Sequence, residues 1–266
     1  MTLLTVEGLS IEAPGGRELV RDVALDVEPG EIVGIVGESG SGKTMTALSL
    51  LGLLPDGVRS VRGSADLGGE PFLRDGRLLK RPNTTMIFQN PTAALNPTMR
   101  IGAQLVRLLA FLDARGNGKR EGRTSRSGRR ERAESLLDSV GIQDPRAVMG
   151  RYPHQLSGGM NQRVMIAMAV TAAPRLLIAD EPTTGLDVTV QAQILELIRS
   201  TVAAQGIGVL FVSHDMGVIA QMCRRVAVMY AGEIREFADV DDIFHSPADS
   251  YTKELLASTA QWSREG

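Results

Sequence analysis

The most informative segment of this chain is Gly37-Glu38-Ser39-Gly40-Ser41-Gly42-Lys43-Thr44. It fits the phosphate-binding loop pattern G-x-x-x-x-G-K-[ST] at every fixed position. The short apolar run Ile32–Val36 before it predicts a buried parallel strand. Residues 45–51 after it lack Gly and Pro and predict a helix. A strand, a glycine-rich loop and a helix in this order indicate a nucleotide site in an α/β fold.

The chemistry of the loop supports this prediction. Glycines let the backbone curl so that N–H groups converge on phosphate oxygens, and the positive end of the helix dipole faces the same anion. Lys43 should reach the β- and γ-phosphates, and the Thr44 hydroxyl should ligate Mg²⁺. The alternative is a glycine-rich turn with a chance lysine, which the flanking strand and helix make the weaker interpretation. All eight loop residues are therefore predicted nucleotide contacts: Gly37, Glu38, Ser39, Gly40, Ser41, Gly42, Lys43 and Thr44.

Composition narrows the class of protein. The 266 residues are 43% apolar and 23% charged, with a net charge of −2, so no overall field favours nucleic acid. The one cysteine, Cys223, excludes an internal disulfide framework and a cysteine metal cluster, which suits a reducing cytosol. We expect no signal peptide at the amino terminus and find no run of about 18 apolar residues. Work at a membrane should therefore pass through a partner.

The hydrophobic pattern of the remaining chain predicts a strand-rich start and a helical insertion. Strands predicted at 4–11 and 19–27 form a hairpin-like start, which we expect to be a small antiparallel sheet beside the nucleotide. From residue 99 to about 156 helical patterns replace strands, which predicts a helical insertion. Within it, residues 115–130 are basic, rich in Gly and Ser and without apolar side chains, and they predict a flexible surface loop. The role of this loop stays open.

Polar side chains follow three predicted strands. An apolar run ends in Asp180 and Glu181; Asp180 is a candidate for holding Mg²⁺ through water, and Glu181 for deprotonating the attacking water. His214 follows the strand at 208–212, where it could bond a γ-phosphate. Gln89 follows the strand at 84–88, on the edge where α/β sheets bind ligands. By themselves, His214 and Gln89 would more simply be structural or capping residues.

A second anion-binding helix start is predicted at Ser157-Gly158-Gly159. Ser157 is a good N-cap, and the two glycines leave the first helical N–H groups accessible. Nothing in the sequence brings it to the phosphate of Lys43, which implies a second nucleotide or a second subunit. The alternative is an ordinary capped helix with permissive glycines.

Taken in order, these motifs resemble the ATP-binding-cassette (ABC) ATPases. The motifs that carry the resemblance are the loop at 37–44, Gln89, Leu156-Ser157-Gly158-Gly159-Met160, Asp180-Glu181, Gly185-Leu186-Asp187 and His214. The resemblance implies an α/β P-loop NTPase core with an N-terminal antiparallel β subdomain and an inserted α-helical subdomain. Residues 1–98 and 165–266 would form the core with its β subdomain. Residues 99–164, including the basic loop, would form the helical subdomain.

The resemblance also implies roles for individual residues. Glu181, His214 and Gln89 would be catalytic, and Thr44, Asp180 and Gln89 would serve the metal. ATP and Mg²⁺ are the implied cofactors. Ser157, Gly158 and Gly159 would contact ATP held by a second cassette, and Asp187 would lie at the dimer interface.

Several further stretches resemble the dipeptide, oligopeptide and nickel importer branch. They are Phe88-Gln89-Asn90-Pro91, Leu95-Asn96-Pro97, Tyr152-Pro153-His154-Gln155-Leu156, Asp180-Glu181-Pro182-Thr183-Thr184, 213–218 and the tail 245–252. The resemblance implies an ATP-hydrolysing importer subunit on the cytoplasmic face of the membrane. Its partners would be two permease subunits, a second cassette and, indirectly, a solute-binding protein. The alternative is a non-transport ABC ATPase acting on a soluble partner.

Two departures from the family pattern accompany the resemblance. Met160 replaces the usual Gln, and Ala13 stands where an aromatic residue that stacks on adenine is expected. The effect of Ala13 on adenine binding, the transported solute (peptide, or nickel and its chelates) and the homotypic or heterotypic nature of the dimer stay open.

Overall fold

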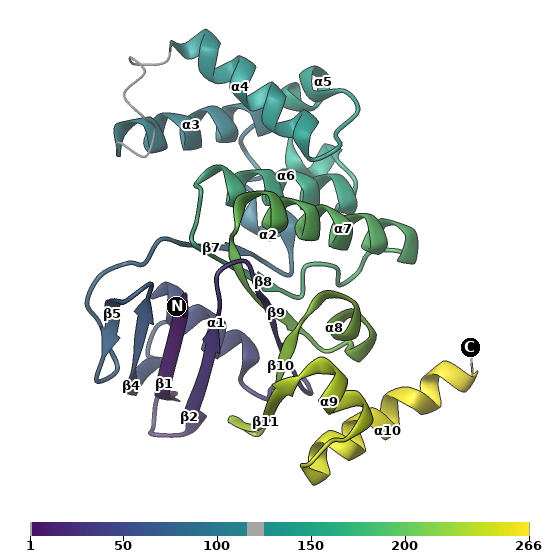
Figure 1. Cartoon of the computed structure of the whole chain (residues 1–266). Helices are drawn as coiled ribbons and strands as arrows, with labels where there is room; N and C mark the ends of the chain where they lie inside the picture. Colours follow the sequence, from purple (N-terminus) through teal and green to yellow (C-terminus); the bar gives the residue numbers. More distant parts are fainter. Residues whose placement is uncertain (1, 116–124, 266) are drawn as a thin grey trace. The chain divides into compact units, whose positions relative to one another are not determined.

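The computed structural model describes residues 2–115 and 125–265, which pack as two compact units (Figure 1). The first unit comprises Met1–Thr84, Arg175–Glu181 and Gln205–Gly266, and the second comprises Thr85–Pro174 and Pro182–Ala204. Packing alone defines these units, so the sequence-based boundaries after residues 98 and 164 stay predictions.

An antiparallel sheet begins the first unit, in the strand order β2-β1-β4-β5-β6. Its strands are β1 (Leu4–Glu12), β2 (Glu18–Val27), β4 (Arg59–Leu67), β5 (Glu70–Arg74) and β6 (Arg77–Leu78). Val6 on β1 pairs with Leu25 on one side and with Ala65 on the other. All three are buried, as expected where one face of an antiparallel sheet covers a core. The predicted hairpin start is thus present, and β4 joins it.

The second sheet of this unit carries the phosphate-binding loop. Its order within the unit is β11-β10-β3-β9-β8, and all neighbours are parallel except β10 and β11. The strands are β3 (Ile32–Val36), β8 (Leu176–Asp180), β9 (Gly208–Ser213), β10 (Arg225–Tyr230) and β11 (Glu233–Asp239). Strands β8 and β9 are buried throughout, which explains why they read as unbroken apolar runs. Because β3, β8 and β9 are parallel, the residues after each of them reach one edge.

Four helices complete the first unit: α1 (Lys43–Leu51), α8 (Met216–Met222), α9 (Val240–His245) and α10 (Ser250–Glu265). Helix α1 follows the loop after β3, as predicted from the sequence. Helix α10 packs beside β11, near the carboxyl end of the chain.

The second unit is mainly helical (Figure 1). It contains α2 (Pro91–Ala94), α3 (Ile101–Ala114), α4 (Arg126–Ser139), α5 (Pro145–Gly150), the 3-10 turn η1 (Pro153–Gln155), α6 (Gly158–Thr171) and nearly all of α7 (Val188–Gln205), and β7 (Thr84–Ile87) enters it. Helices α3 and α4 pack side by side. Leu105 and Leu109 on α3 and Leu137 on α4 are fully buried. No helix in the described part of the chain is long and apolar enough to cross a bilayer.

The predicted loop at 115–130 is too long at its carboxyl end. Helix α4 begins at Arg126, so residues 126–130 are helical, while 116–124 lie outside the described residues. Ser125 caps the helix by accepting the Gly128 N–H at 3.1 Å. Arg129 pairs with Asp113 on α3 at 3.1 Å. The first turn of α4 has no apolar residue to pack, so the Ser125 cap and this ion pair between α4 and α3 stabilise it instead.

Candidate functional site

The phosphate-binding loop links β3 to α1 and is packed too tightly for larger residues at two of its glycines. A Cβ on Gly37, whose φ is +154°, would overlap the carbonyl oxygen of Met229 on β10. A Cβ on Gly42, whose φ is +107°, would lie 2.9 Å from the Leu19 carbonyl oxygen. Left-handed backbone and close neighbours therefore require glycine at both positions. The loop is held in a curled shape by the strands around it.

Lys43 turns back into this loop. Its Nζ donates hydrogen bonds to the carbonyl oxygens of Gly37 at 2.7 Å and Glu38 at 2.8 Å, and the residue is only 5% exposed. Burial lowers the pKa of the Lys43 ammonium, against the opposing charges of Glu181 and Asp180. The ammonium is thus held beside the predicted phosphate position by carbonyl groups that a phosphate oxygen can replace.

Thr44 and Asp180 form the predicted metal pair. The Thr44 hydroxyl donates to Asp180 Oδ1 at 3.3 Å, and Asp180, the last residue of β8, is 5% exposed. Burial raises the pKa of the Asp180 carboxyl. Among residues 2–115 and 125–265, no group of three or more His, Cys, Asp or Glu side chains is arranged to hold a metal ion by itself. One hydroxyl and one carboxylate nevertheless fit Mg²⁺, which keeps several waters and takes further ligands from phosphates.

Glu181 and His214 meet beside this pair. The Glu181 Oε1 atom lies 3.1 Å from Nδ1 of His214, which follows β9. Glu181 has φ +46°, a costly backbone angle for a residue other than glycine, while its N–H still bonds the Val212 carbonyl at 2.9 Å. The sheet bond fixes the backbone and the left-handed turn directs the carboxylate out of the strand. The structure therefore brings together the loop, Asp180, Glu181 and His214.

A turn that sequence reasoning did not connect with the site supports the loop. Between β10 and β11, the Gly232 N–H donates to the Ser41 carbonyl at 2.9 Å. Ala231 and Gly232 both have positive φ, as the two central residues of a type I′ hairpin require. No local sequence pattern tells which distant segment this turn touches.

The other predicted site residues lie in the second unit. Gln89 is exposed after β7, and Asn90 caps α2 by accepting the Ala93 N–H at 3.1 Å. Ser157 caps α6 as predicted, with its Oγ accepting the Met160 N–H at 3.3 Å. Gly158 and Gly159 are the first two residues of that helix.

Gly159 and Asp187 also have local structural roles. A Cβ on Gly159 would lie 2.7 Å from Val190 Cγ1, so this glycine lets α6 approach α7 closely. Asp187 caps α7 by accepting the Val190 N–H at 2.9 Å. Their roles at a second nucleotide, and that of Gln89, stay predictions.

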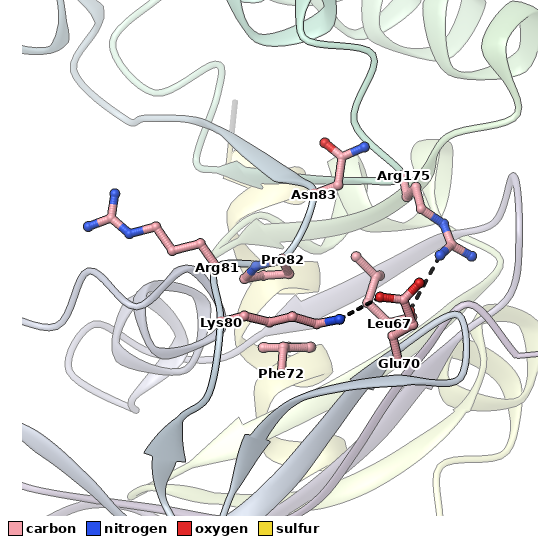
Figure 2. Close-up of a pocket in the computed structure, with 8 residues that line it drawn as sticks. All are labelled: Leu67, Glu70, Phe72, Lys80, Arg81, Pro82, Asn83 and Arg175. Atoms are coloured by element: carbon pink, nitrogen blue, oxygen red, sulfur yellow. Dashed lines mark hydrogen bonds and ion pairs between the residues drawn. The ribbon is translucent and has the colours of Figure 1, made fainter. Parts of the chain in front are cut away.

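A cavity of about 290 Å³ in the first unit has a different character (Figure 2). Lys80 and Glu70 point toward one another across it and form an ion pair 2.5 Å apart. Arg175, just before β8, donates to the Leu67 carbonyl at 3.4 Å, and Arg81 points away. The cavity lies at the amino end of β8, whereas ligands of such sheets bind at the carboxyl ends. We assign it no part in the nucleotide site.

Comparisons with known proteins agree on one family. A sequence model described as "ABC transporter" matches residues 20–184. The dipeptide transport ATP-binding protein DppD of Escherichia coli is 40% identical over 273 residues, covering 100% of this chain and 80% of the relative. The oligopeptide transport ATP-binding protein OppD of Lactococcus lactis is 43% identical over 246 residues, covering 91% and 70%.

Solved structures agree in fold. An ATP-binding cassette in a dimeric, post-hydrolysis state bound to ADP and Pi matches with a TM-score of 0.73 and 26% identity, over 90% of this chain and 99% of that one. Another ATP-binding subunit matches with the same TM-score and identity over 97% of this chain. These likenesses confirm the predicted fold class and the predicted resemblance to the ATP-binding proteins of dipeptide and oligopeptide transport.

Proposed function

Because the chain belongs to the ABC transporter family, we propose that it is the ATP-hydrolysing subunit of a membrane importer for peptides. The observation that carries the proposal is the convergence of Lys43, Asp180 and Glu181 at the carboxyl edge of one sheet. Phosphoryl transfer to water uses groups of these kinds: a buried ammonium, a carboxylate that can hold a metal ion, and a second carboxylate beside a histidine.

The residues of the loop and strand ends would share the work of hydrolysis. Lys43 exchanges its bonds to the Gly37 and Glu38 carbonyls for the β- and γ-phosphates. Glu181 orients the attacking water and accepts its proton. His214, held at 3.1 Å from Glu181, donates to that carboxylate or to the γ-phosphate. A proton acceptor with a positioned donor at its side is the arrangement of an oriented general base.

Thr44 and Asp180 would hold Mg²⁺. A bound Mg²⁺ neutralises charge on the β- and γ-phosphates during transfer. The 3.3 Å bond between the Thr44 hydroxyl and Asp180 keeps the two ligands adjacent, and the buried Asp180 carboxylate gains a counter-charge when the metal arrives.

Transport requires partners that the chain must contact. We infer a second cassette whose nucleotide would be reached by Ser157, Gly158 and Gly159, and two permease subunits that place this chain at the cytoplasmic face of the membrane. The names of DppD and OppD, which are ATP-binding proteins of peptide transport, support the permease partners and the peptide substrate. No relative named above supports nickel or the non-transport alternative.

The test is reconstitution of the complex. The tagged chain is purified from detergent-solubilised membranes and its companions are identified by mass spectrometry. We expect two permeases and a second cassette. In proteoliposomes, ATP should drive uptake of a labelled dipeptide when the matching solute-binding protein is present.

The matched control is the same complex with Glu181→Gln, which should assemble but not transport. Recovery of soluble partners alone would refute the importer assignment. Uptake of Ni²⁺ with no peptide uptake would retain the importer but replace its substrate.

A further inference from the structure

One peptide unit of the phosphate-binding loop is held from two sides. The carbonyl oxygen of Gly37 accepts the Lys43 ammonium at 2.7 Å. The N–H of Glu38, which belongs to the same planar peptide group, donates to the phenol oxygen of Tyr251 at 3.4 Å. Because the carbonyl and N–H of a trans peptide point in opposite directions, the two bonds together fix the rotation of this plane.

Tyr251 belongs to α10 and is itself firmly placed. The Glu236 carboxylate on β11 accepts the backbone N–H groups of Ala248 at 2.8 Å and Asp249 at 3.1 Å. Asp249 in turn accepts the Tyr251 N–H at 2.8 Å. These bonds fix the first turn of α10 on β11, and they leave Tyr251 only 9% exposed.

The ring of Tyr251 also packs against Tyr230, the last residue of β10. Their ring centroids are 4.2 Å apart, a distance at which aromatic pairs attract. Tyr230 directly follows Met229, whose carbonyl faces Gly37 across a gap too small for a Cβ. Strand β10 and helix α10 thus contact the same point of the loop.

The loop needs such a restraint at this peptide. Gly37 has no Cβ and tolerates many backbone angles, so its side of the Gly37–Glu38 peptide can rotate at little steric cost. Rotation would turn the Gly37 carbonyl away from Lys43 and release the ammonium from its position. Local sequence in the loop contains nothing that prevents this.

We propose that Tyr251 is a positioning residue of the phosphate-binding loop. Its phenol oxygen and the Lys43 ammonium hold the Gly37–Glu38 peptide from opposite sides and keep the loop in the shape that receives ATP. The consequence for ATP affinity rests on the proposed function. The restraint on the peptide does not, and it can be measured without nucleotide.

The experiment compares the full chain with its Tyr251→Phe variant, which keeps the ring and loses the acceptor. NMR of the nucleotide-free protein measures hydrogen exchange at the Glu38 amide, which should become about fivefold faster. The Kd for Mg-ATP should rise about two- to tenfold, the effect of one neutral hydrogen bond. The melting temperature should stay within about 2 °C, since the ring packing is retained.

Tyr230→Phe is the matched control, because it removes a hydroxyl from the same ring pair and leaves the acceptor of Glu38 in place. It should change neither the exchange rate nor the Kd. Unchanged Glu38 exchange in Tyr251→Phe, or equal changes in both variants, would overturn the inference. Failure of the wild-type chain to bind ATP would refute the proposed function, and the Glu38 amide would still decide the role of Tyr251.

Discussion

Asp180 is a carboxylate whose charge the fold disfavours. It is 5% exposed, its pKa is raised by burial, and its bond from Thr44 compensates only in part. The nearby Lys43 has a pKa lowered by burial, so both charges are held in an environment that penalises them. Buried charges of this kind are common at binding sites, where a ligand of opposite charge offsets the cost of burial. Here the phosphates would offset the charge of Lys43, and the metal would offset the charge of Asp180.

We therefore expect Asp180→Asn to stabilise the nucleotide-free protein. The gain should be about 1 kcal/mol, or a rise of about 2–4 °C in melting temperature. Because the folded-state pKa is raised, the penalty of the wild type appears only as pH rises from the ordinary value of 3.8 through the folded value. The gain should thus be absent below about pH 4 and should grow as pH rises above it.

Thermal unfolding between pH 4 and pH 8, with and without Mg-ATP, checks this prediction. Asp56→Asn, at an exposed position, controls for the loss of one surface charge. Mg-ATP should stabilise the wild type and the Asp56→Asn variant, but much less the Asp180→Asn variant. A less stable Asp180→Asn protein at pH 7 would contradict the burial argument.

Glu181→Gln tests the general base. The amide retains the size of the side chain but accepts no proton, so turnover should fall about 10²- to 10⁴-fold. The Kd for ATP should stay within about threefold, since Lys43 and the loop are unchanged. Steady-state phosphate release and equilibrium ATP binding measure the two quantities. Normal turnover in the variant would show that another group takes the proton.

At the scale of elements, the approach of α6 to α7 depends on Gly159. Its Cβ would lie 2.7 Å from Val190 Cγ1, whereas a Cβ on the preceding Gly158 has its nearest neighbour, Leu186 Cδ2, at 3.5 Å. Valine strongly prefers one χ1 rotamer in a helix, so turning this methyl group away from Gly159 is costly. Two adjacent glycines that look alike in the sequence therefore differ in function: one is needed for packing, and the other is free of that constraint.

Gly159→Ala should destabilise the protein by about 1–3 kcal/mol through overpacking. Gly158→Ala is the matched control and should be neutral or slightly stabilising, because alanine favours helix. Adding Val190→Ala to Gly159→Ala should restore much of the lost stability, as urea unfolding would show. If ATPase activity of the complex stays low in this double variant, Gly159 also serves nucleotide access; full recovery would limit it to packing.

The elements themselves were largely predictable, with errors where a tertiary contact decides. Strands β3, β8 and β9 are buried on both faces, so apolar runs mark them within one residue. The sequence does not predict the start of α4, because residues 126–130 have no apolar periodicity, whereas the contact of Arg129 with Asp113 on α3 supports the helix. The hydrophobic pattern of a sequence indicates which residues are buried, but it does not indicate which ion pairs form between neighbouring helices.

Across the whole chain, the sequence predicts which residues gather at one edge of the sheet, and it does not predict the contacts that hold them there. The phosphate loop, Asp180, Glu181 and His214 follow parallel strands, so topology alone brings them to one edge. Neither Gly232, which bonds Ser41, nor Tyr251, which bonds Glu38, has a local pattern that points to the loop. These contacts join residues about 190 and 213 positions apart and require the fold.

Arg225 is one of the residues that join the two sheets of the first unit. From the start of β10 it bonds Asp26 on β2 at 2.8 Å and Glu31, just before β3, at 2.8 Å. Its guanidinium also lies 5.0 Å from the ring centroid of Phe237 on β11. Burial raises the pKa of the Glu31 carboxyl, but the bonds from Arg225 and from the Glu28 N–H outweigh it, so the pKa is lowered overall.

Removing this arginine should reverse the response of Glu31 to acid. In the wild type the lowered pKa means that Glu31 contributes stability above its ordinary value of 4.5 and loses it as pH falls through the folded value. The Arg225→Leu variant leaves the Glu31 carboxylate, whose side chain is 3% exposed, without this ion-pair partner. The free energy of unfolding should therefore fall by about 3–5 kcal/mol at pH 7. Burial would then dominate and raise the Glu31 pKa, and the loss should shrink as pH falls toward 4.5.

Urea unfolding of both proteins from pH 7 to pH 4.5 measures this difference. The double variant Arg225→Leu, Glu31→Gln lacks the buried Glu31 charge. It should recover part of the lost stability, and its free energy of unfolding should depend less on pH. A loss that is equally large at every pH would mean that Arg225 acts through its packing on Phe237 and not through Glu31.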